Sequence, residues 1–310
     1  MTNIIFSRKE FEKHIKLTPD IQEKITSFGT PLENLTHESI EIEIFPNRPD
    51  LIPMHGYLRA FKSFLGKETG LKKYRLHKPE KDYKIIVDKS VKEIRPYTAC
   101  AIVKNLSLSD EQIKDIINMQ EKLTLTVGRN RKKMAIGIYP LDKIKLPITY
   151  TAKEPKEIKY QPLGLQHELT APEILAMHPT GRKYAHLLEN HKKYPIFIDA
   201  NRQLLSMPPI INSEQTGRID LSTKEVFIEC SGSEKLVLEK TLVIATSAFA
   251  EMGGKIYQME IKDHENYITP NFATEKMKIS LDKTKKLLGI SLTESELSKL
   301  LHKMGHNYSN

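Results

Sequence analysis

The stretch QLLSMPPIINSEQTG, residues 203–217, places polar side chains on both sides of two consecutive prolines. Ser206 precedes Pro208 and Pro209, and Asn212 follows them. Because proline has a fixed φ and no backbone N–H, the pair predicts a rigid turn between two strands. Such a turn would hold the Ser206 hydroxyl and the Asn212 amide at fixed positions around a small pocket.

The segment EVFIECSGS, residues 225–233, alternates so that Phe227, Glu229 and Ser231 share one face of a predicted strand. A carboxylate on the face of an interior strand costs free energy unless it has a partner or a function. A strand in a one-sided sheet would show the same alternation with this face in water. The residues alone leave both interpretations of Glu229 open.

Four cations in GRNRKKMAIGIY, residues 128–139, precede another predicted strand. They could clamp phosphate groups or belong to a solvated turn beside a buried strand, and both interpretations stay open. The formal net charge of +9 favours an anionic partner such as a nucleic acid, although a lysine-rich surface gives the same total. The four cations are Arg129, Arg131, Lys132 and Lys133.

Several classes of chemistry lack their sequence signature. The chain has no Walker loop, GxGxxG, HExxH or GxSxG, and its 11 histidines are scattered without a metal-binding spacing. Cys100 and Cys230 stand alone in strand-like segments, so we expect buried thiols. No apolar run reaches the length of a membrane span, and the N-terminus does not resemble a signal peptide. We therefore expect a soluble cytoplasmic protein without a metal site or a membrane partner.

The elements that must position these residues follow from the apolar spacing. Near the N-terminus it predicts a helix over 8–29, a strand over 39–45 and a helix that closes at Gly66. A basic linker over 72–82 follows. Residues 85–262 alternate strands with helices, which predicts one α+β domain with mixed sheets.

A helix near the C-terminus repeats the spacing of the N-terminal one. A strand and the PNRPD motif follow the first copy, whereas few residues follow the second, so the second would be half of a repeat. Chance similarity of two short amphipathic helices stays an alternative. A halved repeat would make the chain a fragment or a truncated gene product. The matched sets are Ile21, Ile25, Phe28 and Gly29, and Leu297, Leu301, Met304 and Gly305.

Five segments together resemble the β subunit of phenylalanyl-tRNA synthetase of the archaeal and eukaryotic type: FPNRPDL, RKKMAIGIYPLDKI, PITYTAK, YPIFIDANRQLLSMPPIINSEQTGRIDLSTKEVFIECSGS and ISLDKTKKLLG. The resemblance covers nearly the whole chain, and LSMPPIIN followed by FIECSG is its most specific part. It implies a multidomain α+β protein with a B1-like helix-strand-helix module over 1–70 and a linker over 71–84. The B3/B4 editing domain would then span 85–262, and an incomplete B5 module 263–310.

The resemblance also implies a division of labour between subunits. In this family the α subunit binds ATP and phenylalanine and performs aminoacylation, and the complete synthetase uses ATP and magnesium, so we expect no cofactor in this chain. The expected activity is hydrolysis of tyrosine mischarged onto phenylalanine tRNA, with that tRNA and the α subunit of an α2β2 heterotetramer as partners. Two alternatives stay open: a tRNA-binding or assembly module without hydrolytic activity, and a freestanding trans-editing deacylase.

The archaeal editing pocket aligns with Phe197, Ser206, Glu229 and Ser231. The family more often has an aliphatic residue at the first of these positions and threonine at the fourth, which leaves the size of the pocket open. We expect Glu229 to accept the tyrosine hydroxyl with Ser231 beside it. Ser206 and Asn212 would orient the ester or an attacking water, helped by the terminal ribose hydroxyl. The expected substrate-binding residues are Phe197, Pro208, Pro209 and Ser213.

Overall fold

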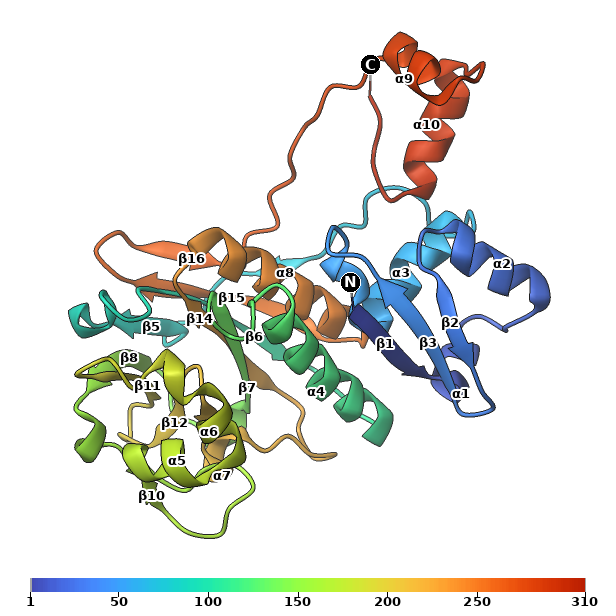
Figure 1. Ribbon diagram of the computed structural model, residues 1–310. Helices are drawn as coiled ribbons and strands as arrows, with labels where there is room; N and C mark the ends of the chain where they lie inside the picture. The colour runs from blue at the N-terminus through green and yellow to red at the C-terminus, as the bar shows by residue number, and fades with distance from the viewer. Residues whose placement is uncertain (1, 310) are drawn as a thin grey trace. The chain divides into compact units, whose positions relative to one another are not determined.

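The computed structural model describes residues 2–309 and divides into two compact units (Figure 1). The smaller unit combines residues 3–74 with residues from 272 onward, and the larger spans 75–271. The assignment of 85–262 as an editing domain and of 263–310 as the start of B5 stays a prediction. Within residues 2–309, no helix combines the length and apolar character that a membrane crossing requires.

The smaller unit contains a three-stranded sheet in the order β1-β3-β2. Its strands alternate in burial: Ile40, Ile42 and Ile44 of β3 are buried, as the predicted strand over 39–45 requires. The helix α3 ends before Gly66, whose positive φ of 83° confirms the predicted end. The strands are β1 (Thr2–Ser7), β2 (Leu32–Leu35) and β3 (Ser39–Ile44), and the helices are α1 (Arg8–Glu12), α2 (Pro19–Ser27), α3 (Met54–Phe64), α9 (Leu281–Leu288) and α10 (Glu294–Lys303).

The single helix predicted over 8–29 is wrong, because the chain forms two helices there. Thr18 caps the second one, α2, by accepting a hydrogen bond from the Ile21 backbone N–H. Pro19 occupies the first turn of α2, where its missing N–H costs nothing, but it cannot continue a helix that arrives from α1. Apolar spacing persisted across this break and concealed it.

The last helix closes as the sequence predicts, since Gly305 follows α10 with a φ of 81°. Within the smaller unit, the Ser63 hydroxyl donates to the His302 carbonyl at 3.1 Å. The Gly70 N–H donates to the same carbonyl at 2.7 Å, and the Leu71 N–H donates to Asn307 Oδ1. These bonds tie the C-terminal segment to the end of α3 and the chain that follows it.

The larger unit is built on an eleven-stranded sheet, which confirms the α+β fold with a mixed sheet. The order is β13-β12-β11-β8-β5-β15-β6-β14-β7, with β4 and β16 also paired to β15. β5 runs parallel to β8 and β15, whereas β14 is antiparallel to both neighbours. The strands are β4 (Leu76–His77), β5 (Lys84–Val87), β6 (Tyr97–Lys104), β7 (Met134–Pro140), β8 (Ile148–Lys153), β11 (Tyr194–Ile198), β12 (Leu204–Met207), β13 (Ile211–Asn212), β14 (Val226–Gly232), β15 (Lys255–Lys262) and β16 (Tyr267–Thr269).

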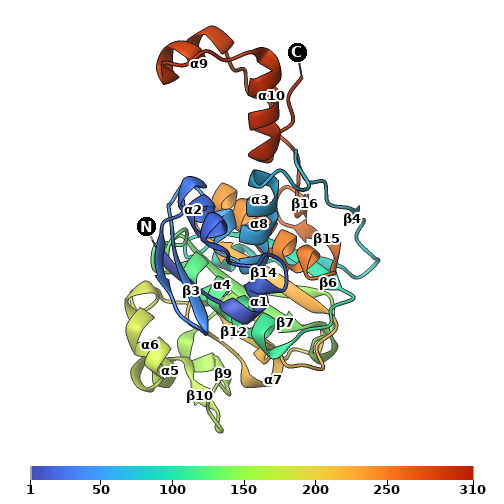
Figure 2. The ribbon, with the colours of Figure 1, turned by 90° about the vertical axis from the view of Figure 1, so that its right-hand side faces the viewer.

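The helices that pack against this sheet belong to the larger unit. α8 packs against β6, β14 and β15, and α4 packs against β7. α5, α6 and a two-stranded ribbon of β9 and β10 lie together and share a second apolar cluster with β11 and β12 of the sheet (Figure 2). The helices are α4 (Asp110–Leu125), α5 (Ala171–Met177), α6 (Pro179–Tyr184), α7 (Glu214–Gly217) and α8 (Lys235–Glu251), and the ribbon strands are β9 (Lys159–Tyr160) and β10 (Leu169–Thr170). Short 3₁₀ turns are η1 (Pro49–Leu51), η2 (Lys89–Val91), η3 (Leu141–Lys143), η4 (Pro155–Glu157) and η5 (Ala185–Leu187).

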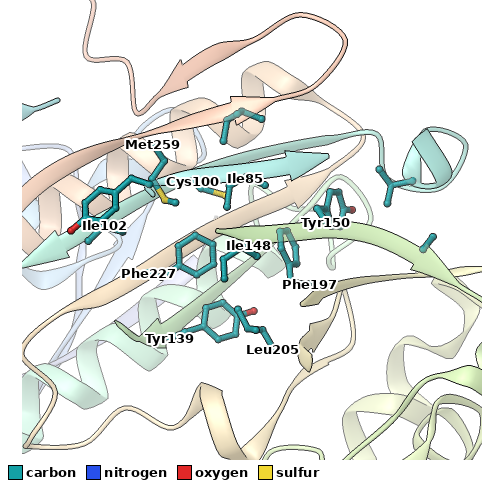
Figure 3. Close-up of a cluster of buried hydrophobic side chains, with 14 residues drawn as sticks. Ile85, Cys100, Ile102, Tyr139, Ile148, Tyr150, Phe197, Leu205, Phe227 and Met259 are labelled. Carbon is teal, nitrogen blue, oxygen red and sulfur yellow. The ribbon is translucent and has the colours of Figure 1, made fainter. Parts of the chain in front are cut away.

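The core of the larger unit lies between the strands that carry the predicted site residues (Figure 3). Tyr139 stacks on Phe227 with ring centroids 5.6 Å apart, and Tyr150 stacks on Phe197 at 4.3 Å. All seven residues of β14 are buried, since neighbouring strands flank it and side chains cover both of its faces. The interpretation of the Glu229 face as solvated is therefore wrong.

Candidate active site

A cavity of about 470 Å³ opens within the larger unit. Its walls come from α4, the start of β7, the segment 163–164, the turn between β12 and β13, the end of α7 and the middle of β14. Six residues predicted from the sequence contribute to these walls, although they belong to three separate stretches of chain. They are Arg131, Ser206, Pro208, Pro209, Asn212 and Glu229.

The two prolines form the turn of a tight hairpin. β12 and β13 pair in antiparallel register, so that Ser206 lies opposite Asn212 and Met207 opposite Ile211. Opposite residues in such a pair point to the same face, which brings the Ser206 hydroxyl and the Asn212 amide together. The predicted turn between two strands is confirmed, and the cavity lies beside it.

Glu229 reaches the cavity from the interior strand β14 and is only 2% exposed. Its Oε1 accepts a hydrogen bond from the Tyr139 hydroxyl at 3.3 Å, whereas Oε2 has no hydrogen-bond partner among the described residues. Burial raises the pKa of Glu229 to about 8, although Ser231, the Arg95 charge and Tyr139 lower it in part. At neutral pH the carboxyl group is therefore mainly protonated, so it can donate as well as accept a hydrogen bond.

Tyr139 connects the predicted polar residues and was missed from the sequence. Its hydroxyl lies 2.8 Å from Ser206 Oγ and 3.3 Å from Asn212 Oδ1, in addition to its bond with Glu229. Burial raises the pKa of Tyr139, so the phenol stays protonated. Only the pairing of β7 with β14 could have identified Tyr139 as part of the site. That pairing places Gly137, two residues before Tyr139, directly opposite Glu229.

Three predicted residues lie outside the described cavity wall. The Phe197 ring is fully buried and stacks on Tyr150 in the core, where it closes the space behind the site. Ser213 caps α7 by accepting a hydrogen bond from the Gln215 N–H. Ser231 is fully buried on β14, and its Oγ has no hydrogen-bond partner of ordinary geometry, although it is near enough to lower the pKa of Glu229.

The four cations after α4 separate into two kinds. The half-buried Arg131 donates to the carbonyls of Pro209 and Ile210 at 2.9 and 2.7 Å, so its guanidinium holds the double-proline turn. Lys133 forms an ion pair with Glu234 at 2.6 Å. The other two, Arg129 and Lys132, are exposed. A role in RNA binding stays a prediction for all four.

Other reactive groups are few within residues 2–309. The thiols of Cys100 and Cys230 are free and buried, as predicted, and burial raises the pKa of both. No group of three or more His, Cys, Asp or Glu side chains is arranged to hold a metal ion in this part of the chain. Of the described residues that line the cavity, none is cysteine or histidine.

The fold is similar to that of a solved structure. It superposes on an N-terminal fragment of the phenylalanyl-tRNA synthetase beta subunit from Pyrococcus horikoshii with a TM-score of 0.93 and 36% identity, covering 99% of this chain and 90% of that one. No protein-family model matches the chain. The fold thus places the chain among N-terminal portions of aminoacyl-tRNA synthetase subunits.

Comparison with curated sequences identifies which subunit this is. The phenylalanine–tRNA ligase beta subunits of Pyrococcus horikoshii and Archaeoglobus fulgidus are 44% and 37% identical over 83% and 92% of this chain. That of Thermococcus kodakarensis is 41% identical over 83%. The chain belongs to the phenylalanine–tRNA ligase beta subunit family. It spans about half the length of the curated relatives it matches, from 45% to 51%.

Proposed function

We propose that the cavity hydrolyses the ester of tyrosine mischarged onto phenylalanine tRNA, and that residues around it form a B3/B4-type editing domain. The observation that carries this proposal is the buried Glu229, which lines a cavity of about 470 Å³ and whose Oε2 has no hydrogen-bond partner among the described residues. A buried acceptor without a donor costs free energy, which a ligand hydroxyl would recover.

This arrangement suits the difference between tyrosine and phenylalanine, which is one hydroxyl group. The phenolic hydroxyl of tyrosine would hydrogen-bond to the Glu229 carboxyl group, while phenylalanine would leave that group without a ligand partner. Sites built to hydrogen-bond a substrate hydroxyl reject the analogue without it by up to about 10⁴- to 10⁵-fold. A neutral Glu229 performs this role without a buried charge, because a protonated carboxyl group both donates and accepts hydrogen bonds.

The hydrolytic step then needs a positioned water rather than a protein nucleophile. Ser206 and Asn212, paired across the hairpin, offer a hydroxyl and an amide at the cavity wall to orient the ester or the water. Water adds to the ester carbonyl carbon, the bond from that carbon to the ribose oxygen breaks, and the ribose oxygen gains the proton. The products are free tyrosine and uncharged tRNA.

The remaining activity of a phenylalanine–tRNA ligase is assigned in this proposal to a second subunit. The α subunit would bind ATP, magnesium and phenylalanine, and would join this chain's full-length form in an α2β2 heterotetramer. The exposed side chains of Arg129 and Lys132 are the cations of their turn that remain available for contact with tRNA phosphates.

A deacylation assay tests the proposal. Tyrosyl-tRNA and phenylalanyl-tRNA, both made on phenylalanine tRNA, are incubated with the chain and with its Glu229→Ala variant. We expect the wild type to prefer the tyrosyl ester and the variant to lose roughly 10- to 100-fold in kcat/KM for that ester, the effect of losing one strong hydrogen bond. Glu154→Ala, at an exposed position of the same unit, is the matched control.

Two results would contradict the proposal. A Glu229→Ala variant that hydrolyses tyrosyl-tRNA at the wild-type rate would remove Glu229 from the site. A wild-type chain that binds tRNA but leaves both esters intact would indicate an RNA-binding or assembly module instead.

A further inference from the structure

The hydroxyl of Tyr139 is the meeting point of the polar groups at the cavity wall. It lies 2.8 Å from Ser206 Oγ, 3.3 Å from Asn212 Oδ1 and 3.3 Å from Glu229 Oε1. These partners come from β12, β13 and β14, whereas Tyr139 belongs to β7. One phenol therefore connects the carboxyl group proposed to recognise the substrate with the two groups proposed to orient the ester.

The position of this phenol is tightly constrained. The Tyr139 ring is fully buried and stacks on Phe227 with an interplanar angle of 28° (Figure 3). Gly137 lies opposite Glu229 in the paired strands. A Cβ at Gly137 would lie 2.3 Å from the Tyr139 oxygen and 2.7 Å from Glu229 Oε1. Glycine is thus the residue that leaves room for the two oxygens to meet.

We propose that Tyr139 is a specificity-determining positioning residue, which binds Glu229 Oε1 and thereby fixes the orientation of the carboxyl group at the cavity wall. This inference rests on the proposed function of the cavity. A carboxyl group can rotate about its last bond, so an untethered Glu229 could turn either oxygen toward the cavity or toward water. With Oε1 bound to Tyr139, the carboxyl group keeps one orientation at the cavity wall.

The sign of the effect follows from this geometry. Without the Tyr139 hydroxyl, the Glu229 carboxyl group is free to rotate. The phenolic hydroxyl of a substrate tyrosine then meets a carboxyl group without a fixed orientation. Phenylalanine makes no bond to Glu229, so its ester should be less affected. Tyr139 also contacts Ser206, and loss of that contact would slow both esters alike. A role in specificity therefore predicts a change in the ratio of kcat/KM for tyrosyl-tRNA to kcat/KM for phenylalanyl-tRNA.

The test uses the Tyr139→Phe variant of the full 310-residue chain, which keeps the ring and removes one oxygen. We expect kcat/KM for tyrosyl-tRNA to fall roughly 10-fold further than kcat/KM for phenylalanyl-tRNA, as the loss of one hydrogen bond predicts. Tyr267→Phe is the matched control, because the Tyr267 hydroxyl donates to the Thr98 carbonyl and does not line this cavity. It should leave the ratio unchanged.

A binding measurement separates this inference from the proposed function. Calorimetry with amide-linked tyrosyl- and phenylalanyl-adenosine, which cannot be hydrolysed as esters, should show a tyrosyl preference that Tyr139→Phe reduces roughly 10-fold. If the wild type hydrolyses neither ester but shows this preference, the hydrolytic function fails and the role of Tyr139 stands. An unchanged ratio in Tyr139→Phe, or an equal loss for both substrates, would overturn the role of Tyr139. So would a wild type without a tyrosyl preference in binding.

Discussion

At the scale of single residues, Glu229 stands out because its ionisable carboxyl group is buried. It is an acid on a fully buried interior strand, and burial raises its pKa to about 8 from an ordinary value of 4.5. Between these two pH values the folded protein binds more protons than the unfolded chain. The resulting contribution to stability is complete below about pH 4.5 and is lost as pH rises through about 8.

This titration gives a prediction for Glu229→Gln. Glutamine cannot ionise, so the variant should gain stability relative to the wild type as pH rises from about 6 to about 9, by on the order of a few kcal/mol. Urea unfolding at a series of pH values measures the difference. Glu154→Gln, at an exposed position, should not change with pH in this way. A constant difference between Glu229→Gln and the wild type would show that Glu229 does not titrate in this range.

The same scale shows what spacing can find. The alternation of residues 225–233 placed Phe227, Glu229 and Ser231 on one face, because side chains of a strand alternate whatever the strand packs against. The alternation alone could not decide whether that face of the strand was exposed to solvent or buried. Burial of Glu229 depends on β7 and on the core beyond it, which the local pattern does not contain.

At the scale of elements, the turn after α4 and the β12–β13 hairpin act together. Arg131 donates to the carbonyls of Pro209 and Ile210 and stacks over Tyr184 at 4.4 Å. The pattern of four cations suggested phosphate contacts for all of them. It could not separate them, because charge spacing does not show which side chain turns back onto its own fold.

The hairpin contact leads to opposite predictions within this turn. Arg131→Met should destabilise the protein by about 1–3 kcal/mol, since it leaves two carbonyls without their donor, and should leave the salt dependence of tRNA binding unchanged. Arg129→Gln and Lys132→Gln should have little effect on stability. If they contact phosphate, each should reduce the slope of log K against log salt by about 1. Urea unfolding and tRNA titrations at several salt concentrations measure both effects. A normal stability of Arg131→Met would contradict its role in the hairpin.

At the scale of the whole molecule, the chain is organised as two compact units. The larger one, residues 75–271, contains the sheet, the cavity and two apolar clusters. The C-terminal segment instead bonds to the end of α3 and the chain after it, through the carbonyl of His302. A core of its own is what allows a segment to fold alone.

We therefore expect residues 75–271, expressed alone, to unfold in one cooperative transition and to keep the tyrosyl-tRNA hydrolysis proposed for the full chain. Circular dichroism during heating and the deacylation assay measure the two properties. The matched comparison is the full chain carrying Ser63→Ala, which removes one bond to His302 inside the smaller unit. It should weaken that unit without changing hydrolysis. A non-cooperative transition for 75–271 would show that the larger unit needs the rest of the chain.

The sequence by itself determined the local features: the strands, most helices, the rigid proline turn, the two buried thiols and the family resemblance. It failed where apolar spacing ran across Pro19, since one helix and two helices present similar periodicity. The tertiary structure alone decided that Gly137 lies opposite Glu229, that Tyr139 joins three strands, and that Arg131 holds the hairpin. Periodicity is a property of neighbouring residues, whereas these contacts depend on the register between distant strands, which only the packing of the whole core selects.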